Sequence, residues 1–118
     1  MHKTVQDALD IAIGLKRKFY TFGEADIVIC PAFTALSKVG DEISDSNIML
    51  GAQDVYWEEE GAFTGEVSPK MLKDTRVRYV IIGHSERRAL FGETDEAVNK
   101  KVKVVLRYGM IPIMCIGE

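Results

Sequence analysis

Apolar and polar residues follow one another along the chain in blocks that predict alternating helices and strands. The first block repeats its apolar residues at helical spacing from Val5 to Phe19. Four later runs, rich in β-branched side chains, predict buried strands at Ile27–Cys30, Asn47–Ala52, Tyr79–Ile82 and Ile111–Ile116. With helices between these runs, the order is αβαβαβαβ. This order predicts an α/β fold in which four parallel strands are joined by helical crossovers.

Start and stop signals set the expected bounds of the helices. Thr4–Asp7 resembles a capping box at the start of the first helix, and Thr34 is the expected cap of a short second helix. Ser68–Pro69 predicts the start of a third helix, because a cap residue precedes proline at the first turn. Thr94 opens a longer helix, which Gly109 is well suited to end.

A loop of about a dozen residues between the second strand and the third helix interrupts this rhythm, and loops of that length are usually functional. The segment Gln53–Glu66 carries Tyr56, Trp57 and Phe63 beside three consecutive glutamates. Exposed aromatic side chains on a long loop favour a partner surface, although they can also fold back onto their own domain. We favour partner contact, because the tip at Ala62 and Phe63 lies between glycines and needs a pocket.

Composition narrows the class of protein. A length of 118 residues fits one domain or part of one, and a net charge of −3 gives no argument for binding nucleic acid or an anionic membrane. No apolar run approaches the roughly 18–20 residues that span a bilayer, and no secretory signal opens the chain. Cys30 and Cys115 lie far apart in apolar strands, which favours reduced core residues over a disulfide or metal pair. We therefore expect a cytoplasmic protein without a metal.

The segment Gly83–Arg88 concentrates the candidate chemistry. It comes directly after the third predicted strand and supplies a histidine, a carboxylate and two arginines. In α/β folds, ligands collect at the carboxyl ends of parallel strands. A neutral imidazole placed there at His84 can polarise a carbonyl group. The alternative is a structural histidine beside a surface network of ion pairs, and the position alone does not separate the two.

Several segments, in order and spacing, resemble the triosephosphate isomerase family. They are Cys30–Thr34, Gly51–Asp54, Gly61–Glu66, Ile82–Arg88, Phe91–Asp95 and Cys115–Glu118. The resemblance covers essentially the whole chain, so that no single short motif has to carry it. It implies a partial (β/α)8 TIM barrel, with residues 1–118 forming one incomplete domain. The family's first strand and its sixth to eighth strands have no counterpart in this sequence.

The resemblance also implies roles for individual residues. His84 corresponds to the neutral electrophile that hydrogen-bonds the substrate carbonyl, and this enzyme family is itself the standard example of an imidazole kept neutral by a helix N-terminus. Glu86 corresponds to the carboxylate beside that histidine, with a structural ion pair as its alternative role. Ser85 corresponds to the residue that meets the catalytic base, with a plain helix cap as its alternative. Glu93 resembles a buried structural carboxylate, which is costly to leave unpaired.

The same resemblance implies a homodimer. The tip of the interdigitating loop corresponds to Thr64, which would reach the active site of the partner subunit. The implied interface residues are Gln53, Phe63, Thr64, Gly65, Glu66 and Arg87, with an ion pair expected between Glu66 and Arg87. No cofactor is implied, and the substrate would be a triose phosphate.

The sequence also departs from the family pattern. Met1–Thr4 matches the residues that come after the lysine that grips the substrate phosphate, so that lysine has no counterpart. The glutamate base, the hinged lid and the glycine-rich phosphate loops also have none. At Asp74–Arg78 the family often has a glycine that ends the helix, which affects only the local turn.

These matches and departures lead to two expectations for this polypeptide. By family it would interconvert dihydroxyacetone phosphate and glyceraldehyde 3-phosphate through an enediol, but alone it is expected to be inactive and prone to self-association through two unpaired strand edges and an apolar interior face. The alternatives are a phosphosugar barrel enzyme of different chemistry, or a non-catalytic half-barrel module that docks a partner through residues 51–66.

Overall fold

The computed structural model describes residues 1–117. Its strands are β1 (Ile27–Ile29), β2 (Ile48–Ala52), β3 (Tyr79–Ile82) and β4 (Ile111–Met114). Its helices are α1 (Val5–Lys18), α2 (Leu36–Ile43), α3 (Pro69–Asp74), α4 (Ser85–Leu90) and α5 (Asp95–Arg107), with a 3₁₀ turn at Phe33–Ala35. All four predicted strands are present, although the first, the second and the last are shorter than expected.

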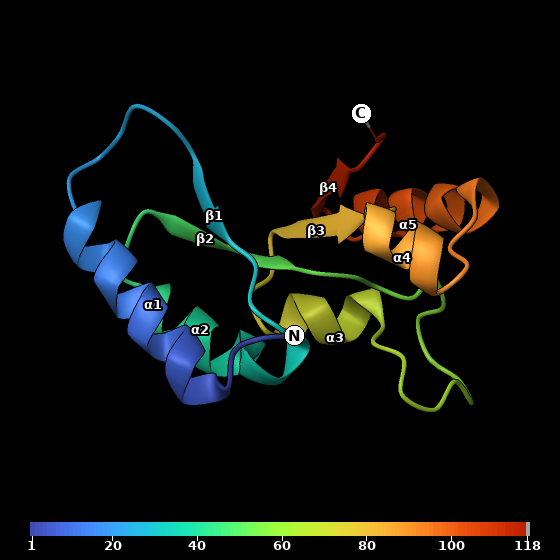
Figure 1. Ribbon diagram of the computed structural model, residues 1–118, viewed down its shortest axis with the longest axis horizontal. Coiled ribbons are helices and arrows are strands. Elements are labelled where there is room, and N and C mark those ends of the chain that lie inside the picture. The colour runs from blue at the N-terminus through green and yellow to red at the C-terminus, as the bar shows by residue number, and fades with distance from the viewer. Residues whose placement is uncertain (118) are drawn as a thin grey trace.

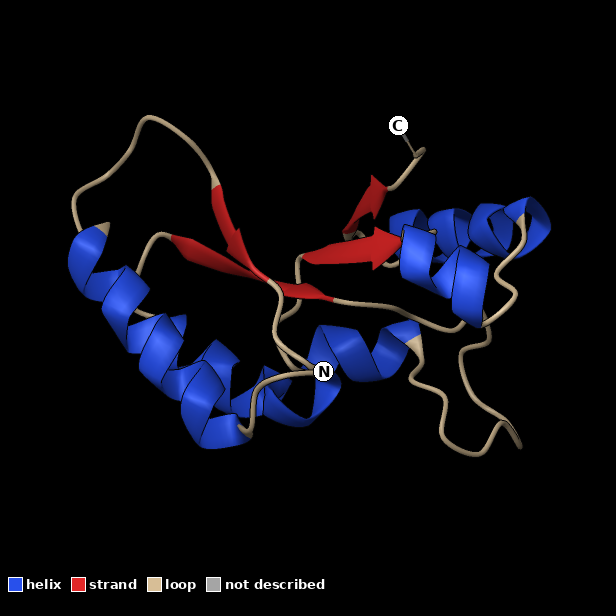
Figure 2. Ribbon diagram, in the orientation of Figure 1, coloured by secondary structure: helices blue, strands red, loops and turns tan. Residues whose placement is uncertain are grey.

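The strands form one parallel sheet in the order β1-β2-β3-β4. Each neighbouring pair is joined through at least one helix, as Figure 2 shows, so the predicted parallel sheet with helical crossovers is confirmed. Helices α1, α2 and α3 lie along one side of the sheet, while α5 packs against β3 and β4 (Figure 1).

The two faces of the sheet differ in burial. Ile48, Leu50, Val80 and Ile82 are buried on the face that the helices cover. Alternate side chains point to the opposite face, which is only partly covered and carries apolar residues at these positions: Met49, Tyr79, Ile81, Ile111 and Ile113. The buried strand expected at Tyr79–Ile82 is therefore buried on one face only in the described residues, because its second face, which is the expected apolar interior face of an incomplete barrel, has no covering layer.

Local signals explain most helix starts. Thr4 and Asp7 exchange both hydrogen bonds of a capping box, and the side chains of Ser68 and Thr94 cap α3 and α5. The predicted cap at Thr34 is wrong. A 3₁₀ turn occupies Phe33–Ala35, and α2 comes after it without a side-chain cap. In place of a hydrogen bond to the Thr34 hydroxyl, the turn has a backbone hydrogen bond from the N–H of Ala35 to the carbonyl of Ala32.

Candidate functional site

The carboxyl ends of the strands meet at one edge of the sheet. The side chain of Gln53, just after β2, donates a hydrogen bond of 2.9 Å to the carbonyl of Cys30, just after β1. A cleft of about 640 Å³ opens here and reaches His84, just after β3. His84 therefore lies on the side of the sheet where Cys30 and Gln53 emerge, as expected for a ligand-binding edge.

The imidazole of His84 is held by the backbone of the helix that begins next to it. His84 is the N-cap of α4, and its Nδ1 accepts a hydrogen bond of 3.1 Å from the N–H of Glu86. An acceptor nitrogen carries no proton, so we assign the proton of the neutral ring to Nε2. The side chain of His84 is 42% exposed, which leaves Nε2 free to donate to a ligand in the cleft.

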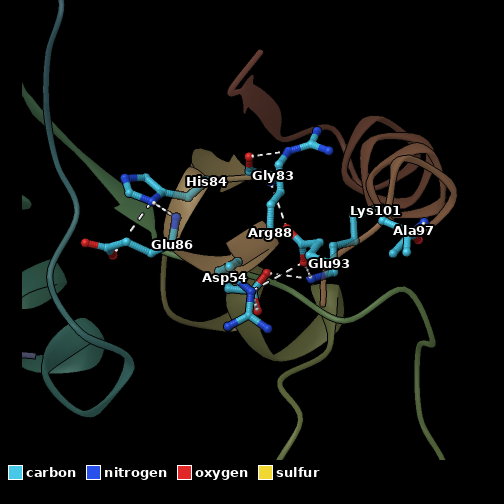
Figure 3. A network of polar contacts seen from close by, with 10 residues as sticks. Asp54, Gly83, His84, Glu86, Arg88, Glu93, Ala97 and Lys101 are labelled. Atoms are coloured by element: carbon cyan, nitrogen blue, oxygen red, sulfur yellow. Dashed lines mark hydrogen bonds and ion pairs between the residues drawn. The ribbon is translucent and has the colours of Figure 1, made fainter. Parts of the chain in front are cut away.

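The carboxylate of Glu86 adds little to this arrangement. Its Oε2 lies 3.7 Å from Nδ1 of His84, beyond hydrogen-bonding distance, and such an ion pair would require a charged ring. The shorter bond to the backbone N–H, drawn in Figure 3 beside the carboxylate contact, favours the neutral ring. Ser85 is exposed at the first helical position. Its alternative role as helix cap is wrong, since His84 fills that position.

A cluster of charges close to the histidine has a buried centre and a partly exposed rim. Glu93 is 8% exposed, and its carboxylate accepts hydrogen bonds from the side chains of Lys101 and Arg87. Asp54, two residues after β2, binds the same Lys101 at 2.8 Å and the same Arg87 at 3.1 Å. Burial opposes the ionised form of Glu93, but the hydrogen bond and charge of Lys101, helped by Arg87, lower the pKa of this carboxyl. The expectation of a buried, paired carboxylate agrees with this geometry.

Gly83 connects this cluster to the histidine. Its N–H donates a buried hydrogen bond of 2.9 Å to Oε2 of Glu93, and its carbonyl accepts one of 2.9 Å from Nε of Arg88 (Figure 3). Its φ is +71°, a conformation that favours glycine.

Sequence reasoning missed these contacts, although one signal was available. Lys101 lies at helical spacing from Val98, Val104 and Val105, on the buried face of α5. A lysine on an apolar helix face needs an acidic partner, which the pattern did not identify.

The long loop is partly folded onto itself and partly exposed, so contact with a partner stays a prediction. Its ends are tied by a hydrogen bond of 2.8 Å from the N–H of Tyr56 to the carbonyl of Val67. The ring of Tyr56 packs against Trp57 and Phe63 at centroid distances of 4.3 and 4.9 Å, so the aromatic side chains fold onto one another. The tip is exposed, however, and includes Phe63, Thr64, Gly65 and Glu66. The described chain therefore leaves these four predicted contact residues accessible.

Arg87 does not pair with Glu66 within the chain. Its Nε instead contacts Asp54 and Glu93, because α4 turns this side chain toward the cluster of charges. The expected Glu66–Arg87 pair is therefore absent from the intrachain contacts of residues 1–117, and a pair between subunits stays a prediction.

Both cysteines carry free thiols and are half-buried, and burial raises the pKa of Cys30. Across residues 1–117, no cluster of three or more histidine, cysteine or acidic side chains has the arrangement of a metal site. Within the same residues, every helix is too short or too polar to cross a bilayer.

Comparison with known proteins gives consistent matches. The family model described as "Triosephosphate isomerase" matches residues 1–118. Proteins named triosephosphate isomerase from Endomicrobium trichonymphae and Moorella thermoacetica are 52% and 51% identical to this chain over all 118 residues, which cover 47% of each relative. The chain thus spans about half the length of the curated relatives it matches.

A solved structure agrees in fold. The crystal structure of triosephosphate isomerase from Bartonella henselae superimposes on the whole chain with a TM-score of 0.87 at 33% sequence identity. The superposition covers 49% of that structure. The four parallel strands described above therefore correspond to half of a TIM barrel.

Proposed function

The chain belongs to the triosephosphate isomerase family, and from this premise we propose that it supplies the electrophilic histidine for interconverting dihydroxyacetone phosphate and glyceraldehyde 3-phosphate. This reaction is a step of glycolysis and gluconeogenesis. The hydrogen bond from the N–H of Glu86 to Nδ1 of His84 is the observation that carries the proposal, because it leaves the Nε2 proton for the substrate.

The proposed role of His84 depends on where charge develops. When a base removes the proton next to the substrate carbonyl, negative charge builds on the carbonyl oxygen, giving an enediolate. A neutral Nε2–H can donate to that oxygen and then move a proton between the two enediolate oxygens. Glu86 and Ser85, both exposed beside the ring, are secondary contributors in this proposal. The chemistry needs proton transfer only, and hence no cofactor.

The proposed assembly is a homodimer in the cytoplasm, as inferred from the family. The exposed loop tip at Phe63–Glu66 would enter the cleft of a second subunit, where Gln53 and Arg87 line the wall. Gly65 and Glu66 of the same chain also line that cleft, so the loop tip and the cleft wall adjoin on one surface of the chain.

We further propose that a polypeptide of residues 1–118 does not turn over substrate by itself. A histidine electrophile has little effect without a base, and this sequence contains no counterpart of the family's glutamate base, phosphate-gripping lysine or phosphate loops. Removing several such groups together lowers the rate by many orders of magnitude.

A chimaera tests the proposed function. Residues 1–118 would replace the matching segment of the Moorella thermoacetica relative, and we expect isomerase activity from the product. His84→Gln should lower kcat by about 10²–10³, the typical effect of losing one positioned acid or electrophile. His2→Gln, which removes the other histidine, is the control and should leave kcat unchanged. A folded but inactive chimaera would contradict the proposal.

The second candidate is a non-catalytic module that docks a partner through residues 51–66. The exposed loop tip is the observation in its favour. A homogeneous closed dimer of the 118-residue chain with a folded core, measured by sedimentation, would favour this module. A mixture of sizes would favour the incomplete barrel.

A further inference from the structure

The peptide units on both sides of Gly83 are fixed by polar side chains. The carboxylate of Glu93 accepts a hydrogen bond from the N–H of Gly83 and so fixes the plane of the Ile82–Gly83 peptide. Arg88 donates to the carbonyl of Gly83 and so fixes the plane of the Gly83–His84 peptide. The φ and ψ angles of Gly83 relate these two planes to each other, and they set the direction in which the chain presents His84.

Gly83 cannot hold this direction by itself. A glycine has no Cβ, and the left-handed region at φ +71° is only one of several that it occupies at similar energy. A Cβ added at Gly83 would meet Arg88 at 2.9 Å and Val98 at 3.0 Å. The guanidinium therefore fills the space where a side chain would otherwise restrict the backbone.

Arg88 is in turn held from its other side. Its Nη1 contacts Asp95 at 2.7 Å, at the start of α5. Arg88 also lies four residues after His84 in α4, and its backbone N–H donates to the carbonyl of His84 at 3.1 Å. Arg88 thus bonds with its side chain to the carbonyl of Gly83, before the histidine, and with its backbone N–H to the carbonyl of His84 itself.

We propose that Arg88 and Glu93 are positioning residues for His84, acting through the backbone of Gly83. The inference takes from the proposed function only that His84 is the working group. Glu93 holds the buried side of the turn, and Arg88 holds the side that faces the cavity lined by His84 and Met114. The distance from Glu86 N–H to Nδ1 then depends on both, since the ring meets that donor only when the peptide before it is correctly oriented.

The amide of Glu86 reports this directly, because the His84 ring is its hydrogen-bond acceptor. Amide hydrogen exchange, measured by NMR on the 118-residue chain, should show a protected Glu86 N–H. In Arg88→Met its exchange should accelerate about tenfold, the effect of losing one hydrogen bond. The reference is the N–H of Ala97, which the Thr94 hydroxyl caps in the same way, and its rate should stay constant.

Two further variants separate positioning from general stability. Asp95→Ala removes the outer contact of Arg88 but leaves its bond to Gly83, so the Glu86 amide should keep its protection. Arg88→Lys retains one donor and should restore part of the protection that Arg88→Met loses. Equal acceleration at Glu86 and Ala97 in Arg88→Met would show a merely structural role and overturn the proposal. An unprotected Glu86 amide in the parent chain would overturn it as well.

Because this readout needs no turnover, it is independent of the proposed function. In the chimaera, positioning predicts that Arg88→Met lowers kcat about tenfold with KM within about twofold, since substrate binding is not the step affected. An inactive chimaera with a normal exchange result would count against the function alone.

Discussion

Arg76 carries a backbone conformation that suits glycine. It is the one non-glycine residue of the described chain with positive φ, at +71°. Helix α3 ends at Asp74, and the N–H groups of Arg76 and Val77 bond back to Lys73 and Leu72 in the pattern of a Schellman cap. Arg76 therefore occupies the position at which the family often has the glycine that ends this helix.

Replacing this arginine should therefore stabilise the chain. We expect Arg76→Gly to raise the free energy of unfolding by about 1 kcal/mol, because a side chain in the left-handed region costs roughly that much. The arginine contacts Asp41 at 3.9 Å, but both side chains are exposed and such a pair contributes little. Urea unfolding at one fixed protein concentration measures the change.

Arg76→Ala is the control for this prediction. It removes the contact with Asp41 but keeps a Cβ in the left-handed conformation, so it should bring no gain. A gain from alanine equal to that from glycine would show that the charge, and not the backbone, is unfavourable at this position.

At the scale of elements, β1 and β2 approach closely through a glycine. Gly51 is buried in β2, and a Cβ added there would meet Sγ of Cys30 at 2.5 Å and Cγ1 of Val28 at 3.1 Å. We expect Gly51→Ala to lower the free energy of unfolding by about 1–3 kcal/mol, as overpacking in a core does. Adding Cys30→Ala should recover part of this loss, because it removes the atom nearest to the new Cβ.

The same substitution elsewhere is a matched control. Gly14 lies within α1 with nothing within 4 Å of its added Cβ, so Gly14→Ala should stabilise by about 0.5–1 kcal/mol. Urea midpoints of the three variants at equal concentration test the set. A destabilised Gly51→Ala that Cys30→Ala does not improve would show that the sulfur is not the limiting contact.

Elements with a strong local signal were predictable from the sequence, and those without one were not. The strands and the longer helices have apolar periodicity and caps, and they appear where expected. Helix α4 was not predicted, because its six residues include no buried side chain and so show no apolar face. The partly exposed second face of the sheet was also unpredictable from strand composition, since burial there depends on a layer that a local pattern does not specify.

The candidate site divides in the same way. His84 was predicted because it stands close behind a strand, and strand ends mark ligand sites. The contacts of Gly83 with Glu93 and Arg88 join residues ten and five positions apart through a turn, which periodicity does not encode. The pairing of Arg87 with Asp54 instead of Glu66 depends on the direction of α4, the element that was missed.

At the scale of the whole molecule, the chain exposes more surface than its mass predicts. Its accessible surface is 7784 Å², whereas a compact monomer of 13.2 kDa exposes about 6,400 Å². The difference of about 1,400 Å² per chain exceeds one partner's share of a standard protein interface, about 800 Å². Apolar side chains on and after β4 contribute to it, among them Ile113, Met114 and Ile116.

This surface predicts self-association of a polypeptide of residues 1–118. In the described residues β1 and β4 each pair along one side only, and free strand edges beside apolar side chains pair with other chains. Light scattering across a concentration series should therefore give masses above 13.2 kDa that rise with concentration. Ile113→Lys should reduce the association, because a charge next to an open edge opposes pairing. Met71→Lys, which changes an exposed methionine on α3, should leave it unaltered. A constant mass of 13.2 kDa, or equal effects of the two lysines, would show that the strand edges are not the surface that associates.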